Sequence, residues 1–114
     1  MTPLTQVGID RERYAHPISF DRAELAIILR IYGRMVAAGE WRDYGISNLR
    51  DRAVFSIFRR AAENPIFQIE KHPKQPNPQS LYRLVSMDGQ VLKRGQHLDA
   101  VMRELERKLI RAVK

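Results

Sequence analysis

The stretch from residue 53 to residue 74 reads AVFSIFRRAAENPIFQIEKHPK, and it contains two short apolar runs that each end in basic residues. Runs of this length that are rich in Phe, Ile and Val predict two β-strands, at 53–59 and 66–71. Pro65 disfavours helical structure at Asn64, so the residues between the two runs are predicted to form a connection. A sheet therefore occupies the middle of the chain.

Further strands are predicted on both sides of this stretch. Bulky and polar residues alternate over 41–46, which indicates a short strand, and strand-like sequence resumes over 81–87. Asp88-Gly89 is typical of a tight hairpin turn, which brings the strand at 90–93 back antiparallel. The segment 72–78 contains three prolines and is predicted to be an exposed loop, because proline cannot donate a hydrogen bond to a neighbouring strand.

A helix is predicted before the sheet, at about 22–38. Asp21 can accept hydrogen bonds from the backbone of the first turn, and Glu24 can return such a bond three residues later, which together form a capping box. Gly39 suits the left-handed conformation that often ends a helix. The apolar face of this helix is predicted from the spacing of Leu25, Ile28, Leu29, Tyr32 and Val36.

A second helix is predicted after the sheet. Its apolar stripe consists of Leu98, Val101, Met102, Leu105, Leu109, Ala112 and Val113. Two helices that flank a run of adjacent strands predict a two-layer α+β fold in the order α-β-β-β-β-α, with an antiparallel sheet of four to five strands and both helices over one face. The other face of the sheet is left to solvent or to a partner.

The length of 114 residues fits one domain with a single modest core. Residues 1–16 are polar and aperiodic, so we expect a flexible N-terminal arm ahead of a domain at 17–114. The sequence has no cysteine, no apolar run typical of a signal peptide and no run long enough to span a membrane. These features predict a cytoplasmic protein without membrane contact.

The net charge of +7 is distributed unevenly along the chain. Residues 1–49 contain six Lys and Arg against six Asp and Glu, whereas residues 50–114 contain fourteen against seven. The whole excess of positive charge therefore lies in the second half of the sequence. A field of one sign favours anionic partners, and nucleic acid is the first of these to consider.

Three sets of basic residues are candidate phosphate contacts. The first set lies at or near the ends of predicted strands, and we expect hairpin geometry to gather it along one rim of the sheet: Arg59, Arg60, Lys71, Lys74 and Arg83. In the second set, Lys93 and Arg94 stand just before the last helix, whose first N–H groups attract anions. The third set is a stripe along that helix, formed by Arg103, Arg107 and Arg111. For each set the alternative is an ordinary solvated surface.

Aromatic residues alternate through the same strands, and some nucleic-acid-binding sheets stack bases on exposed aromatic rings. Here the core is predicted to hold Phe55, Phe58 and Phe67. Tyr82 and Trp41 are predicted to be partly exposed, since each side chain has a polar group. Trp41 and Tyr44, or the amphipathic last helix, are candidate contacts of a homodimer.

The sequence predicts no enzyme, no cofactor and no metal site. The histidines are far apart in the sequence, and none has a second metal-type ligand at helical spacing: His16, His72 and His97. The chain has neither a glycine-rich phosphate loop nor the G-x-S-x-G motif of hydrolases. A catalytic triad assembled only by the fold is the remaining route to catalysis.

Four segments carry a family resemblance. They are IYGRMVAAGEWRDY at 31–44, DRAVFSIFRR at 51–60, IEKHPK at 69–74 and LKRG at 92–95. Together they resemble an alphaproteobacterial family of small proteins, domain of unknown function 2794, and the likeness covers about residues 18–110. The resemblance implies a bacterial cytoplasmic setting, and it assigns no activity, cofactor or site residue.

Two functions are consistent with these features. In the first, the domain binds nucleic acid or a ribonucleoprotein through phosphate contacts, with little reading of base sequence. In the second, the domain is a protein-interaction module or a homodimer, and its charges only keep it soluble. We favour the first because of the charge asymmetry, and it requires that the basic residues of the second half converge on one surface.

Overall fold

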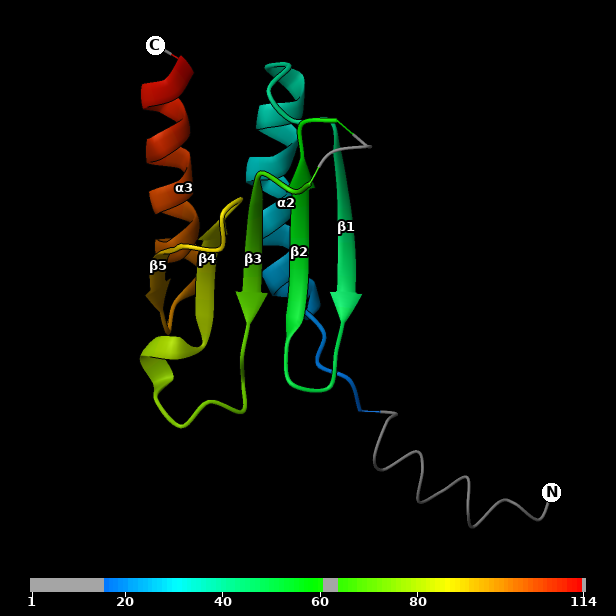
Figure 1. Cartoon of the computed structure of the whole chain (residues 1–114), viewed down its shortest axis with the longest axis vertical. Helices are drawn as coiled ribbons and strands as arrows, with labels where there is room; N and C mark the ends of the chain where they lie inside the picture. The colour runs from blue at the N-terminus through cyan, green and yellow to red at the C-terminus, as the bar shows by residue number, and fades with distance from the viewer. Residues whose placement is uncertain (1–15, 61–63, 114) are drawn as a thin grey trace, which may run out of the picture.

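The computed structural model describes residues 16–60 and 64–113, and side chains as far as Arg107 of the last helix. Of the predicted N-terminal arm, only His16 lies within the described residues. The elements, drawn in Figure 1, follow in the order α2 (Arg22–Ala37), β1 (Asp43–Asn48), β2 (Ala53–Phe58), β3 (Phe67–Lys71), the short 3₁₀ helix η1 (Pro78–Ser80), β4 (Tyr82–Ser86), β5 (Val91–Gly95) and α3 (Leu98–Val113).

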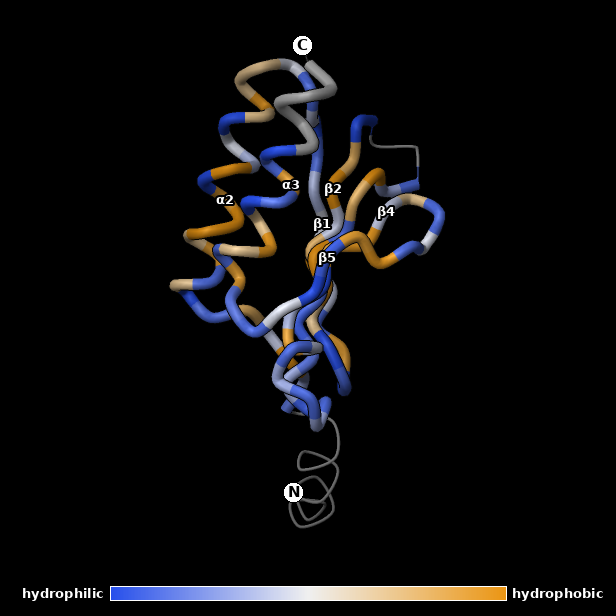
Figure 2. Tube along the Cα trace, turned by 90° about the vertical axis from the view of Figure 1, so that its left-hand side faces the viewer, coloured by the Kyte–Doolittle hydropathy of each residue, from blue (hydrophilic) through white to orange (hydrophobic). Residues whose placement is uncertain are grey.

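The strands form one open antiparallel sheet in which each strand pairs with its neighbours in sequence, in the order β1-β2-β3-β4-β5. Both helices lie behind this sheet in Figure 1, and Figure 2 shows them together on one side of it. The predicted two-layer α+β fold is therefore confirmed, with five strands. We call the sheet face that turns away from α2 and α3 the open face.

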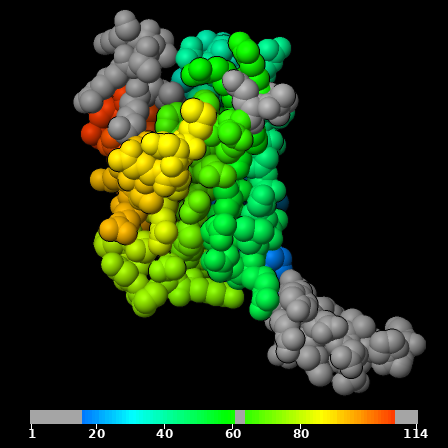
Figure 3. Space-filling view, viewed as in Figure 1, coloured from blue at the N-terminus to red at the C-terminus, as the bar shows by residue number. Residues whose placement is uncertain are grey.

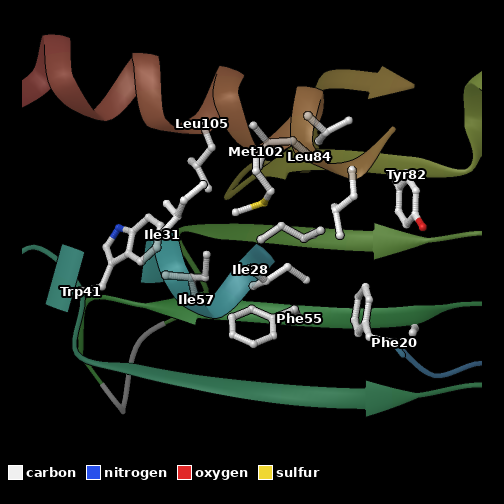
Figure 4. Packing of buried hydrophobic residues seen from close by; sticks show 14 residues of the cluster. Phe20, Ile28, Ile31, Trp41, Phe55, Ile57, Tyr82, Leu84, Met102 and Leu105 are labelled. Carbon is white, nitrogen blue, oxygen red and sulfur yellow. The ribbon is translucent and has the colours of Figure 1, made fainter. Parts of the chain in front are cut away.

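The core lies between the sheet and the two helices. Because strand residues alternate between the two faces, every second side chain of the central strands points toward the helices. Phe55 and Ile57 of β2 and Leu84 of β4 are fully buried there, and Ile28 of α2 and Met102 of α3 meet them from the helix layer (Figure 4). Burial of one such side chain stabilises the fold by about 1.5–3 kcal/mol.

The buried face of α2 differs from the predicted one. Ile28 is buried as expected, but Leu29 and Val36 are each 40% exposed, and Ile31 is buried in their place. The buried row consists of Glu24, Ile28 and Ile31, which repeat at intervals of four and three residues. Leu29 is one residue further along the helix than Ile28, so its side chain is rotated by about 100° out of this row.

The predicted partial exposure of Trp41 and Tyr82 is wrong. Trp41 precedes β1, which begins at Asp43 and not at residue 41, and its side chain is only 3% exposed. Its ring packs 5.8 Å from the ring of Tyr32. Tyr82 is also buried, because its hydroxyl donates to the carboxylate of Glu24 inside the fold and needs no water. Trp41 is therefore not available as a contact of a homodimer.

Both ends of α2 are formed as predicted. The Glu24 N–H donates to Asp21 Oδ1 at 2.8 Å, and the Asp21 N–H donates to Glu24 Oε1 at 2.7 Å, so the capping box is complete. Gly39 follows the helix with φ of +79°, a conformation in which side chains other than glycine are strained. The chain can thus turn directly from α2 toward β1.

Replacing Gly39 with alanine is expected to lower the free energy of unfolding by about 1–2 kcal/mol, because alanine disfavours positive φ. Gly33 provides a matched control within the same helix. It is exposed, and a methyl group there meets no other atom within 4 Å. Gly33→Ala is therefore expected to raise the free energy of unfolding by about 0.5–1 kcal/mol. Urea denaturation followed by circular dichroism measures both; changes of the same sign would contradict the expectation.

Candidate nucleic-acid interface

The predicted basic rim is divided between opposite ends of the sheet. Arg59 and Arg60 follow the end of β2, which lies at the top of Figure 1. Lys71 is the last residue of β3 and pairs with Ala53, the first residue of β2, so Lys71 and Lys74 lie toward the other end. The prediction that these four residues converge is wrong, because successive antiparallel strands end on opposite sides of a sheet.

Lys71 also has a structural partner. Its ammonium lies 2.7 Å from Glu24 Oε1 and donates to the backbone carbonyl of Ser19 at 3.0 Å. The other oxygen of Glu24 accepts the hydroxyl of Tyr82. Burial and this hydrogen bond to Glu24 raise the pKa of Tyr82 well above its ordinary value of 10.0, so the hydroxyl remains a donor. Lys71 is thus paired within the fold and largely buried, so we do not count it among the candidate surface cations.

Arg42, which the sequence pattern does not single out, joins Arg59 and Arg60. Its N–H donates to the carbonyl of Phe58 at 2.9 Å, which extends the pairing of β1 with β2 and places Arg42 beside Arg59. If the predicted strands at 41–46 and 53–59 had been paired with each other, Arg42 would have been predicted to lie next to Arg59. We call Arg42, Arg59 and Arg60 the upper basic group. They line a pocket of about 480 Å³ together with Val36, Gly39 and Trp41.

A second set of cations gathers near the opposite end of the sheet, and we call it the lower basic group: Lys74, Arg83, Lys93 and Arg94. Arg83 of β4 stands directly opposite Arg94 of β5. Like charges in this position destabilise a strand pair, and the carboxylate of Glu70, which stands opposite Arg83 on β3, offsets part of the repulsion. The Nε atom of Arg83 is buried and has no hydrogen-bond acceptor among the described residues.

The anion-binding position predicted just before α3, at Lys93 and Arg94, corresponds to a small pocket of about 170 Å³. Lys93 and Arg94 both contribute to its wall, so the structure brings these two predicted residues together. The remaining wall is formed by Gln79, Gly95, Gln96, His97, Ala100 and Val101. The start of α3 thus lies beside two cations, but the carboxylate of Asp99 in its first turn already occupies the positive end of the helix dipole.

The chain was compared with known protein families, curated proteins and solved structures. Residues 18–102 match the family described as "Protein of unknown function (DUF2794)". The chain belongs to this family. The match confirms the resemblance seen in the sequence, whereas no curated protein and no solved structure matches the chain. Both basic groups lie within the DUF2794 segment.

The arginine stripe of α3 lies beyond the DUF2794 segment and is partly neutralised. Arg103 lies 3.6 Å from a carboxylate oxygen of Asp99, and Arg107 lies 3.5 Å from one of Glu104. The side chain of Arg111 lies outside the described residues. Exposed pairs of this kind contribute about 0–1 kcal/mol and are easily broken. These arginines therefore offer a weaker phosphate surface than the two basic groups.

The open face of the DUF2794 sheet has no row of exposed aromatic rings among its described residues. Phe55 is in the core and Phe67 packs against it, as predicted. Phe58 is half-buried and, by strand alternation, points to the open face, so its predicted core position is wrong. Glu70 and His72, hydrogen-bonded at 2.7 Å, also lie on this face. Contacts to phosphates suit such a surface better than stacking of bases.

Over residues 16–60 and 64–113, no three His, Asp or Glu side chains of the DUF2794 domain are grouped so that they could hold a metal ion. None of the helices in the described part of the chain combines the length and apolar character that crossing a membrane requires.

Proposed function

We propose that this domain binds nucleic acid through phosphate contacts made by the upper and lower basic groups, without catalysis and within the cytoplasm. One observation carries the proposal. No ion pair with a carboxylate is formed, within the described residues, by any cation of the two groups: Arg42, Arg59, Arg60, Lys74, Arg83, Lys93 and Arg94. Unpaired cations are the ones that can release the counterions of a polyanion.

The distance between the groups indicates the size of the ligand. A strand of six residues is about 20 Å long, and β2 is three inter-strand spacings, or about 14 Å, from β5. The upper and lower basic groups are therefore roughly 25 Å apart along a diagonal of the sheet. A duplex rises about 3.4 Å per base pair, so about seven base pairs reach from one group to the other.

This diagonal runs across the open face of the sheet. Figure 2 shows the β4–β5 hairpin bending away from the helix layer, and in Figure 3 its yellow atoms stand on the face that the viewer sees. Arg83 and Arg94 point to this face by strand alternation, whereas Lys93, which pairs with the buried Leu84, points to the helix side. The pocket of the upper basic group lies at the end of α2, where Val36 and Gly39 line it, so a nucleic acid that contacts the cations at both ends would pass over the upper edge of the sheet, with little contact to base edges.

The length of the ligand tests the proposal. Fluorescence anisotropy with labelled hairpins whose stems have about 4, 8, 12 and 16 base pairs, at about 50 mM salt, is expected to show a rise in affinity between the first two lengths. The reason is that a duplex of four base pairs reaches only one basic group. Affinity should change little once both groups are bridged. If no duplex and no single strand of RNA or DNA binds at this salt concentration, the proposal fails.

A second candidate function is self-association through strand β1. Among the described residues no strand pairs with the outer edge of β1, and apolar side chains on it and on the adjacent helix are 40–44% exposed: Leu29, Tyr44 and Ile46. An exposed edge of this kind can pair with a second copy. Light scattering distinguishes the two candidates, since a strict monomer over a wide concentration range excludes the homodimer.

A further inference from the structure

Trp41, which lines the pocket of the upper basic group, has a side-chain donor without a partner among the described residues. Trp41 lines this pocket and is 3% exposed, and its Nε1 atom is buried with no acceptor among the described residues. In Figure 4 the indole nitrogen lies on the outer side of the ring, away from the buried cluster. Burying a donor without an acceptor costs stability, and the ring of Trp41, which lines the pocket, carries this cost next to the three arginines.

The end of α2 does not account for the three arginines. Helix C-termini attract cations because their last carbonyl groups lack partners. Here the carbonyls of Arg34, Met35 and Val36 accept hydrogen bonds from the backbone N–H groups of residues 38–41. The carboxylate next to Arg42, that of Asp43, accepts the N–H of Tyr44 at 2.9 Å and forms no ion pair with the group within the described residues. The guanidinium groups therefore remain available to an external anion.

The charge and the volume of the pocket indicate which anion fits. A phosphomonoester carries a charge of about −1.5 to −2 at pH 7, whereas an internal phosphate of nucleic acid carries about −1. Arginine binds phosphate oxygens through two parallel hydrogen bonds, and three arginines match the more highly charged group better. A volume of about 480 Å³ lies within the range of small-molecule sites, so part of the group attached to the phosphate also fits.

We propose that this pocket binds a phosphomonoester, supplied either by the terminal phosphate of a nucleic-acid strand or by a free nucleotide. The arginines of the upper basic group bind the phosphate oxygens, and the ring of Trp41 forms the wall of the pocket beside them. The inference deepens the proposed function and rests on it where the phosphate belongs to a strand. Where the ligand is a free nucleotide, the inference stands independently.

The first experiment uses the single tryptophan of the chain, because its indole N–H gives one resolved signal in a ¹H–¹⁵N NMR spectrum. Adenosine 5′-monophosphate is expected to shift this signal in a saturable manner, and adenosine is expected to leave it unchanged. The Arg59→Gln/Arg60→Gln variant should weaken the affinity for the monophosphate about tenfold or more. The matched control is Arg22→Gln/Arg30→Gln on the surface of α2, which removes the same charge and should leave the affinity unchanged.

The second experiment compares two single strands of identical sequence, one with a 5′-phosphate and one with a 5′-hydroxyl. The phosphorylated strand is expected to bind about tenfold more tightly, and Arg59→Gln/Arg60→Gln should remove this difference. If both strands bind equally and the monophosphate leaves the indole signal in place, the pocket inference is overturned and the proposed function stands. If the monophosphate binds and no strand binds, the pocket inference holds and the proposed function is overturned.

Discussion

The Glu24→Ala variant is expected to lose about 3–5 kcal/mol of the free energy of unfolding. Glu24 connects three parts of the fold. One carboxylate oxygen accepts the N–H of Asp21 and pairs with Lys71, and the other accepts the hydroxyl of Tyr82. Without the carboxylate, the largely buried ammonium of Lys71 has no counter-charge and the helix loses half of its capping box.

Equilibrium denaturation in urea measures this loss, and an exposed ion pair provides the matched control. Arg34 pairs with Glu106 between α2 and α3, and the arginine side chain is 60% exposed. The Glu106→Gln variant is therefore expected to lose no more than about 1 kcal/mol. Equal losses in the two variants would contradict the assignment of Lys71 and Glu24 to a buried structural pair.

Removing two cations from each basic group is expected to weaken duplex binding by about 100-fold or more at about 50 mM salt. The variant combines Arg59→Gln, Arg60→Gln, Lys93→Gln and Arg94→Gln. Each of these side chains is exposed, so the substitutions should leave the fold intact. Each lost contact to a phosphate costs about threefold to tenfold in affinity at this salt concentration, and the two groups contribute together only when one duplex reaches both.

A control variant tests whether duplex binding depends on the position of the basic residues or only on the net charge of the protein. Arg22, Arg30, Arg103 and Arg107 are exposed arginines of α2 and α3, and converting all four to glutamine removes the same amount of charge. Fluorescence anisotropy of a 16-base-pair duplex is expected to show a decrease of less than about fivefold for this control, through the general field only. If the control lost as much affinity as the first variant, binding would depend on total charge and not on the two groups.

Local signals in the sequence were sufficient to predict most of the fold. The capping box of Asp21 and Glu24, the left-handed stop at Gly39 and the Asp88-Gly89 turn each depend on residues a few positions apart, and each appears in the structure. Alternation of apolar residues similarly located the central strands. Such features need no knowledge of which distant segments meet.

The candidate site was harder to predict because it depends on distant contacts. Glu24 lies 47 residues before Lys71, and no spacing rule indicates that they pair. The hairpin connection between β2 and β3 sends Arg59 and Lys71 to opposite ends, although they are close in sequence. The predicted partial exposure of Trp41 rests on the rule that a polar atom stays in contact with water. In the structure the side chain and its Nε1 atom are buried. Arg42 became recognisable as part of the upper basic group only from its backbone hydrogen bond to Phe58, which the sequence does not reveal.

The salt dependence of duplex affinity tests the central claim most directly. The claim is that the unpaired cations at both ends of the sheet form the phosphate contacts. If all seven contact phosphates, a plot of log affinity against log salt concentration should have a slope of about −6, and the variant that lacks four of them should have a slope smaller in magnitude by about 3 to 4. Identical slopes for the wild-type protein and this variant, or no binding at about 50 mM salt, would contradict the account.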